Sequence, residues 1–89
     1  MSEPMPVYVR KRGRRYLIHD AAAAVERAGR PQGWFAIAEA TVAEFDLNVN
    51  RAGVIFVPAV EGGMDRDWLA SRVAEASSAV YSDLLEAAD

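Results

Sequence analysis

Residues 7–18 read VYVRKRGRRYLI, so two short runs of β-forming residues flank a basic segment. The runs at 7–9 and 16–18 are aromatic and aliphatic, and such residues favour extended structure. Gly13 lies near the middle of the segment and can adopt the positive φ that a tight turn requires. Residues 7–18 therefore predict a β-hairpin with a basic end.

A short helix is predicted directly after this hairpin. Residues 21–28 are strong helix formers apart from one valine. Asp20 precedes them, and its carboxylate is placed to accept from the first free N–H groups of the helix. Gly29 and Pro31 follow, which is typical of a helix end.

Residues 33–49 carry two overlapping patterns. A helical stripe consists of Trp34, Ile37, Ala38, Thr41, Val42 and Phe45. A strand-like alternation consists of Phe35, Ile37, Ala43, Phe45, Leu47 and Val49, and it is interrupted at Glu39 and Thr41. The content of alanine and glutamate favours a helix at about 33–45, followed by a turn or the start of a strand at 46–50.

The most hydrophobic run of the chain is VIFV at 54–57, and its β-branched content predicts a buried strand. A turn at 50–53, which ends in glycine, precedes it, and residues 47–49 are a candidate hairpin partner. Pro58 has no N–H to donate, so we expect it to limit the pairing of this strand inside a sheet.

The last element is a long helix at about 65–88 with Asp65 as its cap. One stripe consists of Leu69, Val73, Ala76, Val80 and Leu84, and Trp68, Tyr81 and Leu85 are expected to widen it. Such a helix is about 36 Å long at 1.5 Å per residue. It therefore packs across a whole sheet or extends to a partner.

These elements predict one α+β domain over residues 1–89. We expect a small antiparallel sheet of three or four strands, packed against two short helices and a long C-terminal helix. Pro4 and Pro6 keep the leading residues out of a central ladder, and residues 1–5 are expected to be flexible.

The composition excludes several classes of function. The chain is 52% hydrophobic and 26% charged, as in globular proteins, and no apolar run approaches the ~20 residues that span a bilayer. It has no cysteine, which removes thiolate metal sites and favours a cytoplasmic protein. One histidine and the absence of a glycine-rich phosphate motif lead us to expect no metal and no cofactor. The absence of a long apolar run leads us to expect no contact with a membrane.

The basic segment is the main indication of function. Its charges come from Arg10, Lys11, Arg12, Arg14 and Arg15. The whole chain has a net charge of −3, so the residues outside these five sum to −8. Basic side chains on a hairpin can contact phosphates, and the flanking Tyr8 and Tyr16 can stack on bases.

The leading hypothesis is a non-catalytic module whose basic hairpin contacts a polyanion, above all nucleic acid. Two alternatives remain for the same segment. Charges on an exposed strand discourage addition of further strands. They can also pair with an acidic patch on another protein, and the overall acidity differs from the basic character of most DNA-binding domains.

Self-association or binding to another protein is the second hypothesis. Trp34 follows a glycine and could be either a core residue or an exposed interface anchor, since aromatic residues carry much of the binding energy at interfaces. Small residues on one side of the last helix, Ala70, Ala74 and Ser77, permit close approach of a second helix. The alternative for them is close packing on the sheet.

An enzyme or small-ligand binder is a distant third hypothesis. His19 next to Asp20 could act as a general base, but no motif marks a nucleophile near it. A histidine where a strand passes into a helix more often caps or packs, so we expect no catalytic residue.

Overall fold

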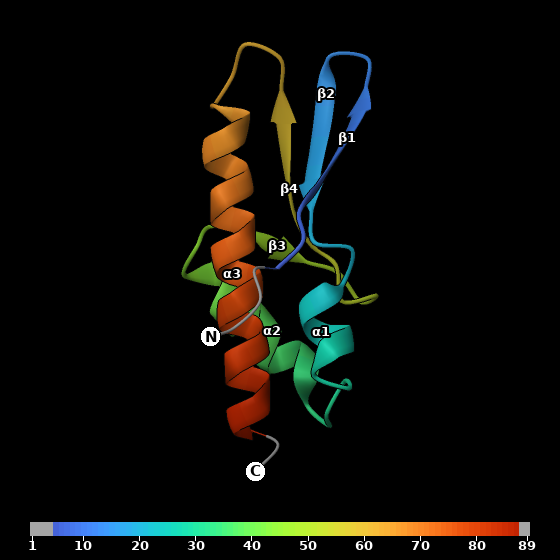
Figure 1. Ribbon diagram of the computed structural model, residues 1–89, viewed down its shortest axis with the longest axis vertical. Helices are drawn as coiled ribbons and strands as arrows, with labels where there is room; N and C mark the ends of the chain where they lie inside the picture. The colour runs from blue at the N-terminus through green and yellow to red at the C-terminus, as the bar shows by residue number, and fades with distance from the viewer. Residues whose placement is uncertain (1–4, 88–89) are drawn as a thin grey trace.

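The structure is a computed structural model that describes residues 5–87, and four strands and three helices lie in this range (Figure 1). The strands form one antiparallel sheet in the order β1-β2-β4-β3. The predicted α+β class, with an N-terminal hairpin and a long C-terminal helix, is confirmed. The elements are β1 (Tyr8–Arg12), β2 (Arg15–His19), α1 (Ala23–Arg27), α2 (Trp34–Ala43), β3 (Asn48–Val49), β4 (Ile55–Val60) and α3 (Arg66–Ala87).

The hairpin is longer than predicted because both of its strands continue into the basic segment. β1 runs through Arg12 and β2 begins at Arg15, so only Gly13 and Arg14 remain in the turn. Gly13 has a φ of 63° at the first central position, the place that glycine takes in a type II′ turn. Most of the basic side chains therefore lie on a pleated ladder and alternate between the two faces of the sheet.

β4 is a central strand of the sheet although it contains Pro58. Its pairing with β3 stops at Phe56, whereas its pairing with β2 continues to Val60. The Ile55 carbonyl accepts from the Asp20 N–H on the β2 side, so alternation along the strand turns the backbone of Pro58 toward the opposite edge. The expected limit on pairing therefore applies only on the β3 side, because no bond to β2 needs the missing N–H.

The longest helix, α3, runs along the molecule and covers one face of the sheet (Figure 1). Its first half packs on β2 and β4, and its second half contacts α1 and α2. The predicted apolar stripe is confirmed, and Ser77 joins it as a buried polar residue. The buried residues of α3 are Leu69, Val73, Ala76, Ser77, Val80 and Leu84.

The expectation for Trp68 is wrong. We expected it to widen the buried stripe, yet 51% of its surface is exposed, and Leu85 is 43% exposed. Tyr81, in contrast, packs half-buried against the core. Trp68 lies about 100° around the helix from Leu69. Because α1 and α2 pack on the second half of α3, no other helix among residues 5–87 covers this flank of its first turn.

α2 resolves the two patterns of 33–49 in favour of a helix, which occupies Trp34–Ala43. It buries Ala38 and Val42, and the Thr41 hydroxyl donates to the Asp83 carboxylate of α3 at 2.7 Å. The chain then turns and forms β3, which pairs with the start of β4 as predicted.

Asp20 is fully buried at the end of β2 and connects four segments of the fold. Its carboxyl oxygens accept from the N–H groups of Ala22 at 2.9 Å, Ala24 at 3.5 Å and Ile55 at 2.9 Å. They also accept from the Ser77 hydroxyl at 2.7 Å. Asp20 thus accepts from free N–H groups as a cap does, but α1 begins later than predicted, directly after Ala22.

The N-terminal residues are described in part. Residues 1–4, which we expected to be flexible, lie outside the described residues, whereas Met5 is buried in the core. Within residues 5–87, no helix combines the length and the apolar character needed to cross a membrane.

Candidate nucleic-acid interface

The sheet has one face under α3 and one face that none of the three described helices covers. Residues directly opposite each other on antiparallel strands share a face, so the strand register assigns each side chain. Tyr16, Ile18 and Ile55 are buried on the side of α3. The other side, here called the outer face, consists of three rows: Tyr8, His19 and Phe56; Arg10, Leu17 and Pro58; Arg12, Arg15 and Val60.

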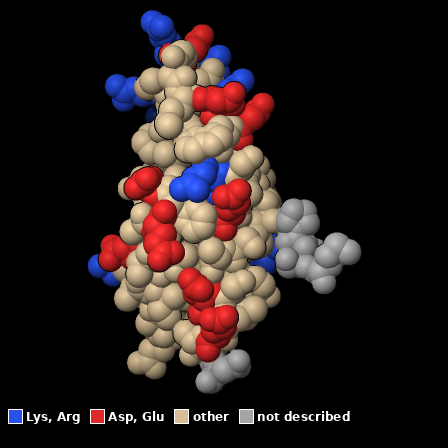
Figure 2. Space-filling model, turned by 90° about the vertical axis from the view of Figure 1, so that its left-hand side faces the viewer, with Lys and Arg blue, Asp and Glu red and all other residues tan. Residues whose placement is uncertain are grey.

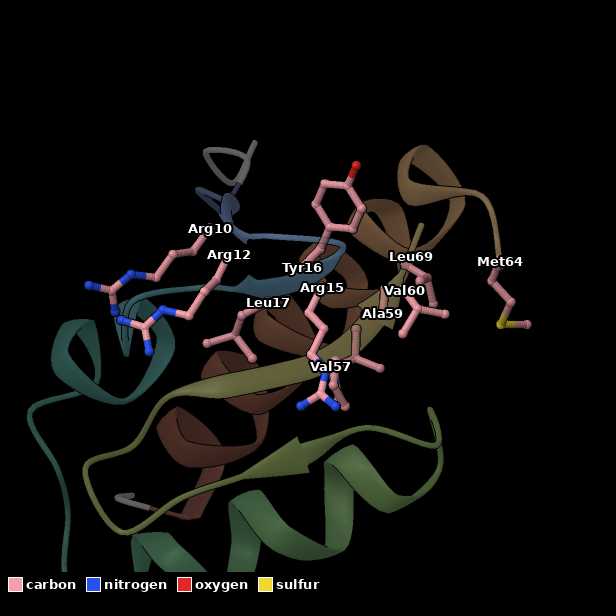
Figure 3. Close-up of a pocket in the computed structure, with 11 residues that line it drawn as sticks. Arg10, Arg12, Arg15, Tyr16, Leu17, Val57, Ala59, Val60, Met64 and Leu69 are labelled. Carbon is pink, nitrogen blue, oxygen red and sulfur yellow. The ribbon is translucent and has the colours of Figure 1, made fainter. Parts of the chain in front are cut away.

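The register brings three of the five predicted basic residues, Arg10, Arg12 and Arg15, onto the outer face. In Figure 3, Arg10 and Arg12 extend side by side from β1, Leu17 points to the same side, and Tyr16 points the opposite way. These arginines border an open hollow of about 740 Å³ that extends along β2 and β4 to the start of α3 and is also lined by Tyr16, Ala59 and Leu69 of the α3 side. None of the nine outer-face residues is buried.

The guanidinium groups of the outer face have no carboxylate partner within residues 5–87. The ion pairs in this range join Arg30 to Glu26 and Arg72 to Glu75, outside the hairpin. Figure 2 shows several Lys and Arg side chains at the hairpin end of the molecule, with Asp and Glu beside them there and along the face below. Among the side chains that the structure describes, the guanidinium groups of the outer face are therefore not engaged in ion pairs.

The other two basic residues of the segment lie elsewhere. Lys11 alternates to the α3 side of β1, where its ammonium nitrogen lies 5.8 Å from the centroid of the Tyr16 ring. Arg14 lies in the turn, and its carbonyl accepts from the Glu61 N–H at 2.8 Å, which ties the turn to the end of β4. The run of five charges is thus divided among two faces and a turn.

Tyr8 and Tyr16, which we expected to stack on bases together, lie on opposite sides of the sheet. Tyr16 is 9% exposed, and the Arg66 guanidinium lies over its ring at 4.8 Å from the centroid. Tyr8 is 49% exposed on the outer face. Its ring stacks on that of His19, with centroids 5.6 Å apart and an interplanar angle of 27°. Of the two tyrosines, only Tyr8 is placed to meet a ligand on the outer face.

Phe56 and His19 complete an aromatic row across three strands that the sequence prediction missed. The period of two in 54–57 implies that alternate side chains share a face, but it does not say which set faces the helices. That choice follows from the pairing of Phe56 with His19. His19 also accepts from the Ala21 N–H through Nδ1 at 3.0 Å, so it makes the packing and capping contacts that we favoured.

The residues predicted to contact a protein partner do not form one surface. Trp34 is half-buried against the core, with the Arg30 guanidinium 5.1 Å from its ring centroid. Ala70 and Ala74 are half-buried on α3. Ser77 is fully buried and donates to Asp20, so it is not accessible to a partner.

Within residues 5–87, no group of three or more His, Cys, Asp or Glu side chains is arranged to hold a metal ion. Comparison with models of protein families finds no match, and neither does comparison with curated proteins or with solved structures.

Proposed function

We propose that this protein binds nucleic acid through the outer face of its sheet and does not catalyse a reaction on it. The observation that carries the proposal is the placement of Arg10, Arg12 and Arg15 on one uncovered face with the exposed ring of Tyr8. Guanidinium groups form paired hydrogen bonds with phosphate oxygens, and an aromatic ring beside them can stack on a base.

The charge of the remaining surface supports the same choice of face. The chain has a net charge of −3 and the hairpin segment contributes five positive charges, so the rest of the protein repels polyanions. A polyanion that approaches the molecule is therefore steered toward the hairpin end.

The test is the binding of fluorescent oligonucleotides, measured by anisotropy over a range of salt concentrations. We expect the double variant Arg10→Ala/Arg12→Ala to weaken binding and to reduce the slope of log K against log salt by about 1.4–1.8, because two phosphate contacts are lost. The matched control is Arg27→Ala/Arg51→Ala, which removes the same charge away from the outer face.

Circular dichroism of both double variants establishes that they fold. Equal weakening by the two double variants would mean that net charge alone drives binding. No binding of the unmodified protein to DNA or RNA at low salt would refute the proposal.

A second candidate function is a protein–protein adaptor or self-associating module. It is favoured by Met64 and Trp68, which are 63% and 51% exposed and lie four residues apart at the start of α3. Large exposed apolar side chains close together in the chain can form a contact surface between proteins. The oligomeric state in solution tests this candidate.

A further inference from the structure

We infer that the outer face selects single-stranded nucleic acid over duplex, and that its aromatic row acts as a stacking platform for unpaired bases. The inference rests on the proposed function and names the class of ligand. The outer face combines aromatic rings, arginines and apolar residues at spacings that suit a single strand.

The rings that could stack on a base lie in the row of Tyr8, His19 and Phe56, which crosses three adjacent strands. Tyr8 is 49% exposed and His19 and Phe56 are half-buried, so none of the three residues is closed off from the outer face. In a duplex the faces of the bases are covered by their neighbours. Only an unpaired or unstacked base can lie flat on a side-chain ring.

The arginines lie beside this row at a spacing that suits a short strand. Arg10 and Arg12 are two and four residues beyond Tyr8 on β1, which corresponds to about 7 and 14 Å along the strand. The distance from β1 to β4 is about 10 Å, because adjacent strands lie about 4.8 Å apart. A platform of this size accommodates roughly two or three nucleotides, with bases on the rings and phosphates on the guanidinium groups.

The apolar residues of the outer face fit the same ligand. Leu17 and Pro58 lie in one row with Arg10, between the aromatic row and the row of Arg12 and Arg15, and the hollow that they help to line is open. The bases and sugars of a single strand can place apolar surface against these two side chains. A duplex, in contrast, exposes its charged phosphates along its outside. Within residues 5–87 no helix lies on the outer face, so contact with a major groove would have to be made by the β1–β2 ribbon.

The test compares oligo(dT) and oligo(U) with a duplex of equal length, at equal salt, by fluorescence anisotropy. We expect both single strands to bind at least 10-fold more tightly than the duplex. Tyr8→Leu and Phe56→Leu keep apolar bulk but remove a ring, and each is expected to weaken single-strand binding roughly 5- to 150-fold. Their salt slope should stay unchanged, because no phosphate contact is lost.

Two controls separate stacking from other effects. Tyr8→Phe retains the ring and should bind like the unmodified protein. Trp68→Leu removes an exposed ring that is not on the outer face and should also leave binding unchanged. As a measurement that needs no variant, the ring protons of Tyr8 and Phe56 should shift upfield in NMR spectra when oligo(dT) is added.

The outcomes distinguish this inference from the function on which it rests. Duplex binding that equals single-strand binding, or full affinity in Tyr8→Leu and Phe56→Leu, would overturn the stacking platform. Loss of affinity in Arg10→Ala/Arg12→Ala would still uphold nucleic-acid binding. Absence of binding to every oligonucleotide would overturn both.

Discussion

At the scale of single residues, Asp20 does the most to hold the outer face in place. Its carboxyl group joins the end of β2, the start of β4, the first turn of α1 and the middle of α3 through four hydrogen bonds. His19 and Phe56 lie one residue from Asp20 and from its partner Ile55. The buried contacts of Asp20 therefore fix the aromatic row on the other side of the sheet.

Asp20→Ala is predicted to lower the free energy of unfolding by about 3 kcal/mol or more, because several buried N–H and O–H groups lose their acceptor. Ser77→Ala removes one donor from the same carboxyl group and leaves three, so we expect a loss of about 1 kcal/mol. Urea denaturation followed by circular dichroism measures both. Equal losses in the two variants would contradict the central role of Asp20.

At the scale of elements, the connection from β2 to α1 adopts an unusual backbone conformation. Ala21 and Ala22 have φ values of 54° and 64°, in the left-handed region that glycine adopts without strain. Their N–H groups donate to His19 Nδ1 and to Asp20 Oδ1, which holds the turn in place. The acceptors of His19 and Asp20 compensate for the left-handed conformation, which alanine does not favour. Because Ala21 and Ala22 adopt this conformation, α1 begins only at Ala23.

Ala21→Gly is predicted to raise the free energy of unfolding by about 0.5–1 kcal/mol, since glycine removes the Cβ strain of a left-handed residue that is exposed. Ala36→Gly is the matched control, because Ala36 is also exposed but lies within α2. There the same change should lower stability by about 1 kcal/mol. Thermal unfolding of the two variants gives the sign of each effect. A lower stability of Ala21→Gly than of the unmodified protein would contradict the proposed strain at Ala21.

At the scale of the whole molecule, the basic hairpin lies at one end of an elongated domain. The molecule extends over 43 × 28 × 19 Å, and the basic hairpin lies at one end of the longest direction. α3 runs along this direction and buries residues from Leu69 to Leu84 within the domain. Its length is therefore explained by packing inside one chain and does not by itself require a partner.

Light scattering at several concentrations tests the second candidate function at this scale. Self-association through the start of α3 predicts a mass above 9.7 kDa that rises with concentration, because Met64 and Trp68 would be buried between copies. Trp68→Glu should restore the monomer, whereas Leu85→Glu, at the other end of α3, should not. A constant mass of 9.7 kDa would refute self-association and leave the nucleic-acid proposal intact.

Much of the fold could be predicted because local patterns agree with the final structure. The apolar stripe of α3, the caps of its first turn and the alternation of the hairpin all depend on neighbours within a few positions. Asp65 Oδ1 accepts from the N–H groups of Asp67 and Trp68, as its place before the helix indicated. The basic segment was found in the same way, as a run of charges.

The sequence by itself determined the α+β class, the order of the elements and the presence of a basic hairpin, since these follow from short-range periodicity and charge. Only the tertiary structure decided which charges act together. A strand pattern of period two does not state which face is covered, and the pairing of β2 with β4 under α3 settled it. That pairing buried Tyr16, turned Lys11 away from the outer face and placed Phe56 beside His19. Contacts between residues far apart in the chain made these choices, so no local pattern could reveal them.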